Sequence, residues 1–447
     1  MFHRLLYNVV LWTFFLFYSP VFFFRMFRQR KRVGALRQRF GVVPRLAHPS
    51  RPRIWLHAVS VGEIMVLQPL IQKLKEENLS VVISTTTATG NHLARRLYSD
   101  LAEAVIFFPF DFNFAVRGSL NAIKPDLFAL VETEIWPNFL WNCARRGISA
   151  FLINGRISDR SYPRYQMIQR LLAPSLKHIE RFCMQSAKDA QRMIELGADP
   201  ARVRITGNLK YDIEPRQRQQ QLNLLIREVL GVGPKVPLLV AGSTAPGEEA
   251  MLLESVRQIR KSNIDLKVVI APRNPERFQD VAGLLTAHGM RFTRRSFFSE
   301  YDLAHPLKSE VRYDAFLLDS IGELTGVYEA ATIVFVGKSL VPGGGHNIVE
   351  PAFFGKPILF GPYMENFQEI ADTFLQQNAA IQVMNPADLT QQMHHLLRNR
   401  DVRISMGERA SRIISDNRGA AVHTLQEIRE LVVRKPELAT RGTPKPE

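Results

Sequence analysis

A carboxylate follows directly on an apolar run near the start of the chain, in the segment HAVSVGE at residues 57–63. The small residues before it, Gly62 included, let a ligand approach the backbone closely. The amphipathic run 63–77 predicts a helix that begins at this acid. Glu63 is therefore expected at the carboxyl edge of a strand, where open α/β sheets bind ligands. The alternative stays open that the helix dipole alone favours an acid in a first turn.

A glycine-rich turn, Gly343–Gly345, lies between an apolar run and a predicted helix. A turn in that place offers backbone N–H groups and the positive end of a helix dipole to an anion. Asn347 and Glu350 share one face of the helix, and Glu350 can accept hydrogen bonds from ribose hydroxyls. Glycines alone also serve tight turns. The glycines, His346-Asn347 and the acid before Pro351 together are a stronger signal than glycine alone.

Two further acids, Glu132 and Glu134, stand at alternate positions of a predicted strand in VETEIWPN. Side chains two residues apart on a strand point to the same side, so both carboxylates are expected on one face. They can position substrate hydroxyls, or they can pair with a structural arginine such as Arg156. Arg273, between a predicted strand and a predicted helix, is a candidate phosphate contact on local grounds.

Strands and helices must position these residues. From about residue 50, short apolar runs alternate with longer amphipathic ones. The alternation predicts parallel sheets covered by helices. A polar stretch interrupts it at 213–221, and it restarts after Pro237, so we expect two similar α/β halves with the ligand in the cleft between them. The predicted strands are 53–59, 79–86, 104–110, 127–133, 149–155, 181–186, 202–207, 238–244, 266–272, 315–320, 332–339 and 356–361.

Composition narrows the class of protein. A chain of 447 residues exceeds the size at which one core usually keeps growing, which favours two domains. Lys and Arg number 58 against 42 Asp and Glu, a net charge of +16, which favours anionic partners without choosing among phosphate, lipid and nucleic acid. Cys143 and Cys183 form no CxxC or Cys/His cluster, so neither a disulfide framework nor a zinc site is indicated. The chain has no GxxxxGK[ST] and no GxGxxG after its first strand, which disfavours nucleotide binding through those motifs.

The amino terminus predicts a membrane anchor. Residues 5–24 carry no charge, which is just enough length to span a bilayer. Residues 25–40 then hold seven Arg or Lys and no acid, so they are expected on the cytoplasmic side near anionic lipid. Asn8, Ser19 and Pro20 make the apolar run imperfect, so a full span and an interfacial helix both stay open.

Several of these segments resemble the motifs of one family, the bacterial 3-deoxy-D-manno-octulosonic acid (Kdo) transferases. The resemblance covers nearly the whole chain and is carried by HAVSVGE, STTTATG, KPDLFALVETEIWPNFL, INGRISDRS, GNLKYD, APRNPERF and GGGHNIVEPA. It implies a GT-B glycosyltransferase of two Rossmann-like domains with an interdomain cleft. It also implies an inverting enzyme on the cytoplasmic side of the inner membrane, with CMP-Kdo as donor and a lipid A precursor, lipid IVA, as acceptor.

The resemblance also assigns roles to residues. Inversion by single displacement needs one carboxylate as base, and by resemblance that base is Glu63. Lys210 and Arg273 are implied to meet the phosphate of the CMP leaving group, although Lys210 without the family reads as a solvated turn residue. No metal and no other cofactor is expected. At Ala245-Pro246 the chain departs from the family's usual His-Glu pair, which leaves the two residues before them as contacts. The substrate-binding residues implied are Gly62, Glu132, Glu134, Lys210, Ser243, Thr244, Arg273, Gly322, Glu323, Leu324, Gly344, Gly345, His346, Asn347 and Glu350.

The expected organisation is an anchor and basic segment over 1–40, an acceptor-binding domain over 41–215, a CMP-Kdo-binding domain over 216–435 and a disordered tail over 436–447. A sugar-nucleotide epimerase on the same architecture is the alternative function, because fold alone does not assign a reaction. A basic adaptor or nucleic-acid binder is disfavoured, since no basic helix with interleaved aromatics is present and the positive charge concentrates beside the anchor.

Overall fold

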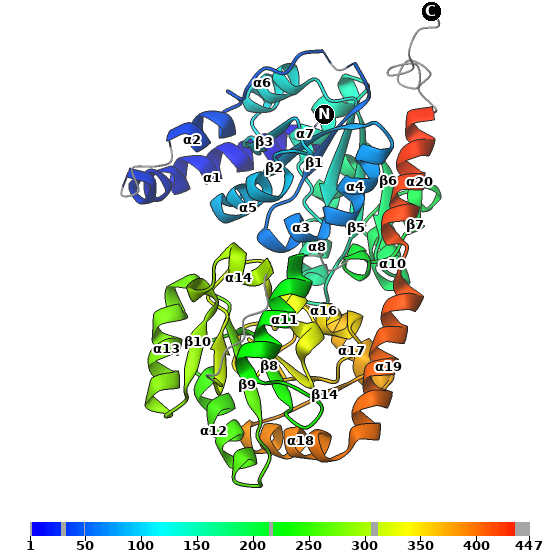
Figure 1. Ribbon diagram of the computed structural model, residues 1–447. Helices are drawn as coiled ribbons and strands as arrows, with labels where there is room; N and C mark the ends of the chain where they lie inside the picture. The colour runs from blue at the N-terminus through cyan, green and yellow to red at the C-terminus, as the bar shows by residue number, and fades with distance from the viewer. Residues whose placement is uncertain (1, 28–32, 49, 214–217, 305–311, 434–447) are drawn as a thin grey trace, which may run out of the picture. The chain divides into compact units, whose positions relative to one another are not determined.

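The polar stretch after Ile213 coincides with a boundary between two units of the chain. The computed structural model describes residues 2–27, 33–48, 50–213, 218–304 and 312–433 (Figure 1). The first unit runs to Ile213 and includes the chain from Asn417 onward, and the second unit comprises Glu214–Asp416. Each unit contains one seven-stranded sheet. The expected pair of α/β domains is therefore present.

The first unit is built on parallel strands in the order β3-β2-β1-β4-β5-β6-β7. The strand order reverses between β1 and β4, which are paired directly. At such a point the connections that leave neighbouring strands diverge, and open α/β sheets bind ligands there. The strands are β1 (Arg53–His57), β2 (Ser80–Thr85), β3 (Ala104–Phe107), β4 (Leu127–Val131), β5 (Ser149–Gly155), β6 (Ile179–Met184) and β7 (Val203–Ile205).

Helices cover both faces of this sheet (Figure 1). They follow the strands in regular alternation from β1 to β6, as the sequence pattern predicts. The helices of the unit are α1 (Phe2–Phe27), α2 (Val33–Arg39), α3 (Val61–Val66), α4 (Gln68–Glu76), α5 (Ala88–Tyr98), α6 (Asn113–Ile123), α7 (Pro137–Arg145), α8 (Tyr162–Met167), α9 (Gln169–Leu176), α10 (Ala187–Glu195) and α20 (Ala420–Val433).

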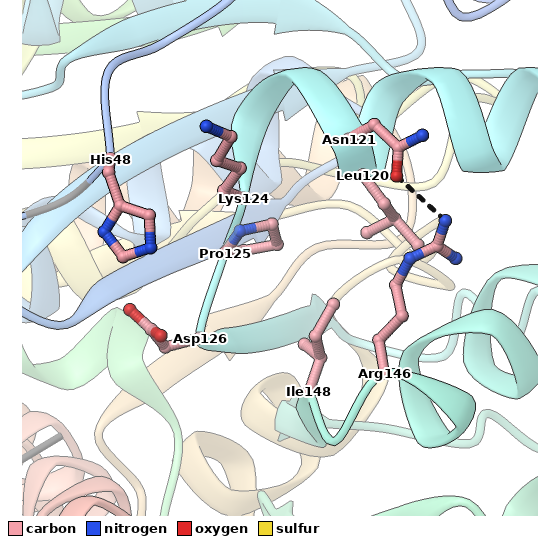
Figure 2. Close-up of a pocket in the computed structure, with 8 residues that line it drawn as sticks. All are labelled: His48, Leu120, Asn121, Lys124, Pro125, Asp126, Arg146 and Ile148. Carbon is pink, nitrogen blue, oxygen red and sulfur yellow. Dashed lines mark hydrogen bonds between the residues drawn. The ribbon is translucent and has the colours of Figure 1, made fainter. Parts of the chain in front are cut away.

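The two edges of the sheet are lined by different residues. Glu63 and Glu132 follow the carboxyl ends of β1 and β4, whereas Asp126 and Ile148 precede β4 and β5 at the amino edge. At the amino edge these two residues border a hollow of about 450 Å³, together with residues of α6 and of the turn after α7 (Figure 2). The edges therefore offer two separate places for ligands.

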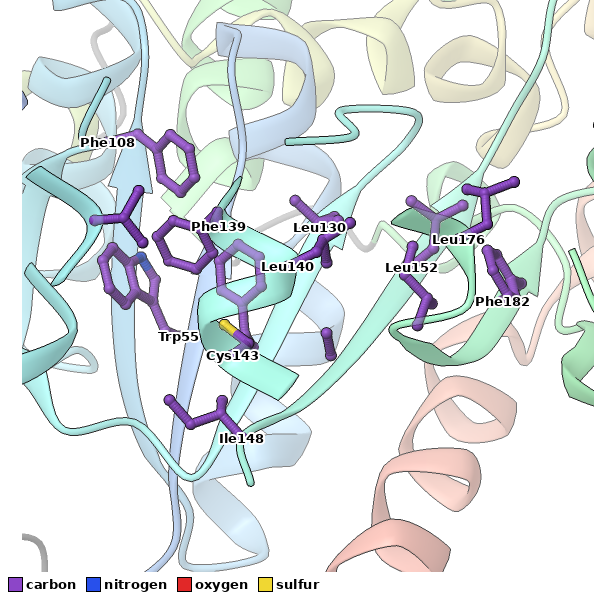
Figure 3. Packing of buried hydrophobic residues seen from close by; sticks show 14 of the residues in the cluster. Trp55, Phe108, Leu130, Phe139, Leu140, Cys143, Ile148, Leu152, Leu176 and Phe182 are labelled. Atoms are coloured by element: carbon purple, nitrogen blue, oxygen red, sulfur yellow. The ribbon is translucent and has the colours of Figure 1, made fainter. Parts of the chain in front are cut away.

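Strand β1 shows how the residue pattern fills both faces of the sheet. Trp55 packs on one face against Phe128 and Phe139, whose ring centres lie 5.9 and 5.2 Å away (Figure 3). Its neighbours Ile54 and Leu56 belong to the core on the other face. Each fully buried side chain of this kind stabilises the fold by roughly 1.5–3 kcal/mol. The sheet is consequently a rigid support for the loops at its edges.

The second unit repeats the design with parallel strands in the order β10-β11-β9-β8-β12-β13-β14. Its order reverses between the paired strands β8 and β12. The strands β10 and β14 were not predicted, because their segments, FTR and AIQ, contain polar residues and form no continuous apolar run. The strands are β8 (Leu238–Thr244), β9 (Lys267–Pro272), β10 (Phe292–Arg294), β11 (Ala315–Leu317), β12 (Ile333–Val336), β13 (Ile358–Phe360) and β14 (Ala380–Gln382). The helices are α11 (Arg218–Leu230), α12 (Glu248–Arg260), α13 (Phe278–Ala287), α14 (Glu300–Ala304), α15 (Leu324–Val327), α16 (Val349–Phe353), α17 (Gln368–Gln376), α18 (Pro386–Arg398) and α19 (Arg400–Asn417).

The last described helix, α20, belongs to the first unit, whereas the expected second domain ran to residue 435. Asp212 accepts hydrogen bonds from the backbone N–H groups of Gly419 and Ala421 at 2.7 and 2.6 Å. Arg181 of β6 forms an ion pair with Glu427 at 2.6 Å. These contacts join residues more than 200 positions apart, so no local pattern could have assigned α20. The expected tail at 436–447 lies outside the described residues.

The apolar amino terminus forms α1, which packs against α7 and α9. The rings of Trp12 and Phe15 lie 4.4 and 5.1 Å from that of Phe112, and the hydroxyl of Tyr7 donates to Asp111 at 2.8 Å. Among the residues that the structure describes, no helix combines the length and the apolar character needed to cross a membrane. Part of the expected basic segment, residues 28–32, lies outside the described residues.

Candidate functional site

The turn between β1 and α3 holds the carboxylate of Glu63 by both oxygens. The backbone N–H of Val59 donates to Oε2 and the hydroxyl of Ser60 donates to Oε1, each at 2.8 Å. Ser60 is also the N-cap of α3 and accepts the N–H of Glu63. This pattern resembles a capping box, but the acid accepts the N–H of Val59 and the hydroxyl of Ser60 in place of the N–H of Ser60. Glu63 thus lies at the strand edge as expected and also stabilises a first helical turn, so both readings of the sequence describe it.

Glu63 lies beside a cavity of about 210 Å³ at the carboxyl edge, next to the reversal between β1 and β4. The predicted residues Glu132 and Glu134 line the same cavity. Loops after β1, β4 and β5 contribute to it, because the carboxyl ends of parallel strands meet at one edge. The lining residues are Glu63, Glu132, Thr133, Glu134, Arg156, Ser158, Ser161 and Tyr165.

Burial and neighbouring charge raise the pKa of two of the acids in the cavity, Glu63 and Glu134. Burial, and then the charge of Glu132, raises the pKa of Glu63 to about 7, although the hydrogen bonds from Val59 and Ser60 oppose the rise. Burial, and then Glu132, also raises the pKa of Glu134. A carboxylate whose pKa lies near neutrality can take a proton from a hydroxyl and release it again. The cavity can therefore support general base chemistry.

Glu132 and Glu134 do not occupy alternate strand positions, and that part of the prediction was wrong. Strand β4 ends at Val131, and Glu132 begins a turn with a φ of +58°. The turn is held by hydrogen bonds from Thr133 to the carbonyl of Arg156 and from the hydroxyl of Tyr165 to the carbonyl of Thr133. The two acids nevertheless reach one cavity, because the turn redirects the chain at the sheet edge.

The sequence analysis did not single out Ser158, Ser161 or Tyr165 as site residues. Ser158 and Ser161 follow β5 in the segment INGRISDRS, and their hydroxyls lie 2.9 Å apart. The rule that ligands bind after the carboxyl ends of strands could have found Ser158. Tyr165 comes from α8 and reaches the cavity only through tertiary packing.

Lys210 lies in a short 3-10 turn, Leu209–Asp212, of the first unit. Lys210 is only 9% exposed, so the alternative that it is a solvated turn residue was wrong. The side chain of Asn208 caps the turn by accepting the N–H of Lys210 at 3.0 Å. Lys210 and Gly62 are not among the residues that line the Glu63 cavity.

In the second unit, the predicted residues Ser243 and Thr244 end β8. Ser243 adopts a φ of +56°, and the buried hydroxyl of Thr244 donates to Glu249 at 2.8 Å. Glu249 in turn forms an ion pair with Arg277 at 2.5 Å. The end of β8 is therefore fixed by a charged pair that the sequence did not indicate.

Glu248 is a further residue that the sequence analysis missed. It is fully buried and accepts the N–H groups of Ala245, Lys338, Ser339 and Leu340 at 2.6 to 2.9 Å. These bonds tie the loop after β8 to the loop after β12. Two adjacent acids directly after a predicted strand, at residues 248–249, were a usable signal. If such acids are buried, each needs several hydrogen-bond donors nearby.

The glycine turn after β12 requires glycine at two positions. Gly344 and Gly345 adopt φ values of +87° and +71°. A Cβ on them would lie 2.2 Å from the side-chain nitrogen of Asn366 and 2.3 Å from the sulfur of Met364. Helix α16 begins only at Val349, so the expectation that the helix starts directly after the glycines was wrong. The glycines therefore allow close packing, and the turn is held by hydrogen bonds from the N–H of Gly345 to Lys338 and from the N–H of Asn366 to Gly344.

Beyond the glycines, charged and polar side chains lie close together. Glu350 accepts hydrogen bonds from Thr325 at 2.8 Å and from Asn347 at 3.3 Å. Burial raises the pKa of Glu350, and these bonds and the charge of Arg273 oppose the rise. Burial, with the charges of Arg273 and Lys338, lowers the pKa of His346 to about 3, so His346 is neutral at pH 7. The structure thus brings Arg273, His346, Asn347 and Glu350 together.

The segment Gly322–Leu324 adjoins this group through Thr325. Gly322 has a φ of +87°, and Glu323 accepts hydrogen bonds from Arg295 at 3.0 and 3.2 Å and from the hydroxyl of Ser320. Leu324 begins α15. The carboxylate of Glu323 is thus engaged by its own unit. Among the described residues, no group of three or more His, Cys, Asp or Glu could hold a metal ion.

Comparisons with known proteins relate the chain to glycosyltransferases. The profile of a family described as "3-Deoxy-D-manno-octulosonic-acid transferase (kdotransferase)" matches residues 34–213. The chain is 31% identical to the 3-deoxy-D-manno-octulosonic acid transferase of Haemophilus influenzae, over 91% of this chain and 93% of that protein. It is also 35% identical to a bifunctional glycosyltransferase/methyltransferase of Fusobacterium nucleatum over 74% of this chain. The matched region covers 50% of that protein's length.

One solved structure shows that the fold extends to distant proteins. A glycosyltransferase from Rickettsia africae superposes with a TM-score of 0.55 over 86% of this chain and 99% of that one, at 13% sequence identity. At this identity the likeness concerns the fold alone. Two Rossmann-like units in one chain are therefore the shared feature.

Proposed function

The chain belongs to the Kdo transferase family, and we propose that it moves Kdo from CMP-Kdo to a lipid A precursor with Glu63 as general base. It is a glycosyltransferase enzyme, and Kdo transfer places it in lipopolysaccharide biosynthesis. The observation that carries the catalytic proposal is the cavity in which Glu63 lies beside two further acids with its pKa raised to about 7.

The proposed reaction is a single displacement with inversion. The acceptor hydroxyl attacks the anomeric carbon of Kdo, the bond from that carbon to the phosphate oxygen of CMP breaks, and Glu63 takes the hydroxyl proton. A base with a pKa near 7 is partly ionised at neutral pH and still basic enough to act. The hydrogen bonds from Val59 and Ser60 hold the carboxylate in one orientation.

We assign the acceptor to the first unit. The Glu63 cavity is lined mainly by polar groups, and its volume of about 210 Å³ suits part of a sugar and excludes an acyl chain. Glu132 and Glu134 would accept hydrogen bonds from sugar hydroxyls, and Ser158 would donate or accept one. The reacting hydroxyl would then lie beside Glu63.

We assign the donor to the second unit. Arg273 and the backbone N–H of Gly344 would meet the single phosphate of CMP, and Glu350 would accept hydrogen bonds from the ribose. The Nε2 atom of His346 is buried without a hydrogen-bond partner among the described residues, which supports a ligand contact there. Ser243, Thr244 and the Gly322–Leu324 segment complete the proposed donor contacts in this unit. A single phosphate met by cations requires no metal ion.

We propose that α1 and the basic segment hold the enzyme on the cytoplasmic side of the inner membrane. Leu16 and Phe17 of α1 are 70% and 78% exposed, and seven cations follow in residues 25–40. Apolar contact and attraction to anionic lipid would act together. Deleting residues 1–33 should release the protein from membrane vesicles while it still transfers Kdo to detergent-dispersed acceptor. Retention of the truncated protein on vesicles would contradict this proposal.

The test of the activity is incubation of the purified chain with CMP-Kdo and a tetra-acylated lipid A precursor, followed by mass analysis of the lipid. Addition of one or more Kdo units, and its loss in Glu63→Gln, is the expected result. An unchanged lipid accompanied by isomerisation of a sugar nucleotide would instead indicate the epimerase alternative.

A further inference from the structure

Four arginines form a cluster on the first unit, away from the Glu63 cavity. Arg4 comes from α1, Arg117 from α6, and Arg145 and Arg146 from the end of α7. The guanidinium groups of Arg4 and Arg145 lie 3.1 and 4.7 Å from the centre of the Trp141 ring. We call these four residues the arginine cluster.

Neutral amides, not carboxylates, accept the hydrogen bonds of the arginine cluster. Arg4 donates to Asn113 at 2.9 Å, and Arg146 donates to Asn142 at 3.3 Å and to Asn121 at 3.0 Å. Asn142 also donates to Asn113 at 3.1 Å, which links the two arginines through amides. Within the described residues, none of the four arginines forms an ion pair. The amides satisfy donors but leave the positive charge uncompensated.

The four arginines repel one another, although Arg117, Arg145 and Arg146 are exposed and water screens part of that repulsion. Burial, and then the charges of Arg117 and Arg145, lowers the pKa of both Arg4 and Arg146. A helix dipole stabilises cations at a carboxyl-terminal end, which accounts for Arg145 and Arg146. It does not account for Arg4, which lies in the first turn of α1, or for Arg117, which lies in the first half of α6. An anionic ligand would remove the repulsion.

The hollow at the amino edge of the sheet adjoins the arginine cluster. It measures about 450 Å³, within the range of small-molecule sites. It shares Arg146 with the cluster, and its lining also includes Asn121, which accepts a hydrogen bond from Arg146. Figure 2 shows Lys124 at the end of α6 and Arg146 after α7, with the bond from Arg146 to Asn121 between the two elements. The one carboxylate of its lining, Asp126, accepts the backbone N–H of Arg53 at 3.0 Å. A ligand in the hollow would meet two cationic side chains.

We infer that the arginine cluster and this hollow bind a phosphate ester at a site separate from the Glu63 cavity. Guanidinium groups match the oxygens of a phosphate with pairs of hydrogen bonds, which favours a phosphate over a diffuse anion. Arg4 and Arg145 both lie over the Trp141 ring, so this ring is already engaged by two cations. The hollow precedes β4 and β5, whereas Glu63 and Glu132 follow the opposite ends of their strands. A ligand bound here therefore leaves the proposed reaction centre unoccupied.

The phosphate can belong to a lipid headgroup or be free in solution, and two probes separate these sources. The full chain in neutral detergent is titrated calorimetrically with inorganic phosphate and with dihexanoyl phosphatidylglycerol. Saturating CMP is present, so that phosphate does not report on the donor site. The test variant is Arg117→Gln/Arg145→Gln/Arg146→Gln, and the control is Lys235→Gln/Lys261→Gln/Arg409→Gln, which loses the same charge from the second unit.

We expect saturable binding of at least one probe, weakened about tenfold or more in the test variant and unchanged in the control. Binding of both probes with similar affinity indicates the phosphate group alone, and binding of the lipid only indicates a headgroup. No saturable binding, or equal weakening in the control, would overturn the inference. If the triple variant does not fold, Arg146→Lys keeps the charge and loses the paired hydrogen bonds. It should weaken binding severalfold, and unchanged binding would also count against the site.

Discussion

The two sheets present acids at the same topological position and use them in opposite ways. In the first unit, Glu63, Glu132 and Glu134 line one cavity beside the reversal between β1 and β4. In the second unit, Glu248 and Glu249 follow β8, beside the reversal between β8 and β12, and both are fully buried. An acid that lies beside the reversal of strand order is therefore not marked by its position alone as catalytic or as structural.

The partners of each acid make the distinction. Glu248 accepts four backbone N–H groups, and Glu249 is paired with Arg277, so both charges are compensated. Glu63 instead has two donors and faces the charge of Glu132, and its pKa rises to about 7. A carboxylate whose charge is compensated by several donors or by an arginine holds a loop in place. A buried carboxylate beside other carboxylates can instead exchange a proton.

The largest expected effect is on catalysis in the first unit. Glu63→Gln keeps the shape of the side chain and removes the base, so kcat should fall by on the order of a hundredfold or more. Titration calorimetry should find CMP affinity unchanged, and circular dichroism should find the fold intact. Glu76→Gln, an exposed acid on α4, is the matched control and should retain activity. Near-native turnover of a folded Glu63→Gln would remove Glu63 from the role of base.

The matching change in the second unit should act on stability. Glu248→Ala leaves four buried backbone donors without an acceptor, which should lower the free energy of unfolding by about 2–3 kcal/mol. Chemical denaturation of the full chain measures this, with the exposed Glu254→Ala as control. If Glu248→Ala were as stable as the wild type and lost activity instead, the contrast between the two units would fail.

A smaller effect is expected on donor affinity. Arg273→Ala and Glu350→Ala should each weaken CMP binding by about tenfold, because each removes one charge-assisted contact. Calorimetric titration with CMP measures the dissociation constant, and Arg294→Ala, an exposed arginine of the same unit, provides the comparison. Unchanged CMP affinity in both variants would place the donor elsewhere.

In Glu132→Gln, the pH at which kcat rises should move by less than about one pH unit. Glu63 must be ionised to act as base, so kcat should rise with pH through about 7. Glu132→Gln removes a negative charge that raises the pKa of Glu63, so this rise should shift to lower pH. Steady-state rates across pH 5 to 9 measure it. A shift to higher pH would contradict the assigned coupling.

The smallest expected effect is that of chelation. If Arg273 and the glycine turn meet the charge of the leaving phosphate, exhaustive EDTA treatment should leave the rate unchanged. Rates before and after dialysis against EDTA provide the measurement. Loss of activity that Mg²⁺ restores would require a metal ion on the donor side.

The sequence by itself determined every described strand except β10 and β14, because the apolar runs of the others are local and continuous. Each of the twelve predicted runs overlaps a strand of the structure, and the acid in HAVSVGE lies at the carboxyl edge as expected. The capping pattern Ser60 to Glu63 was also readable from spacing alone. These features depend on residues within one turn or one strand of each other.

Only the tertiary structure decided what surrounds those residues. The burial of Lys210, the turn at Glu132 and the four donors of Glu248 arise from segments far apart in the chain. The return of α20 to the first unit and the gathering of arginines from α1, α6 and α7 have the same origin. Periodicity records which side of an element is apolar, but desolvation and neighbouring charges depend on which elements meet. Those two terms set the pKa of Glu63, so the chemistry of the site follows from the fold.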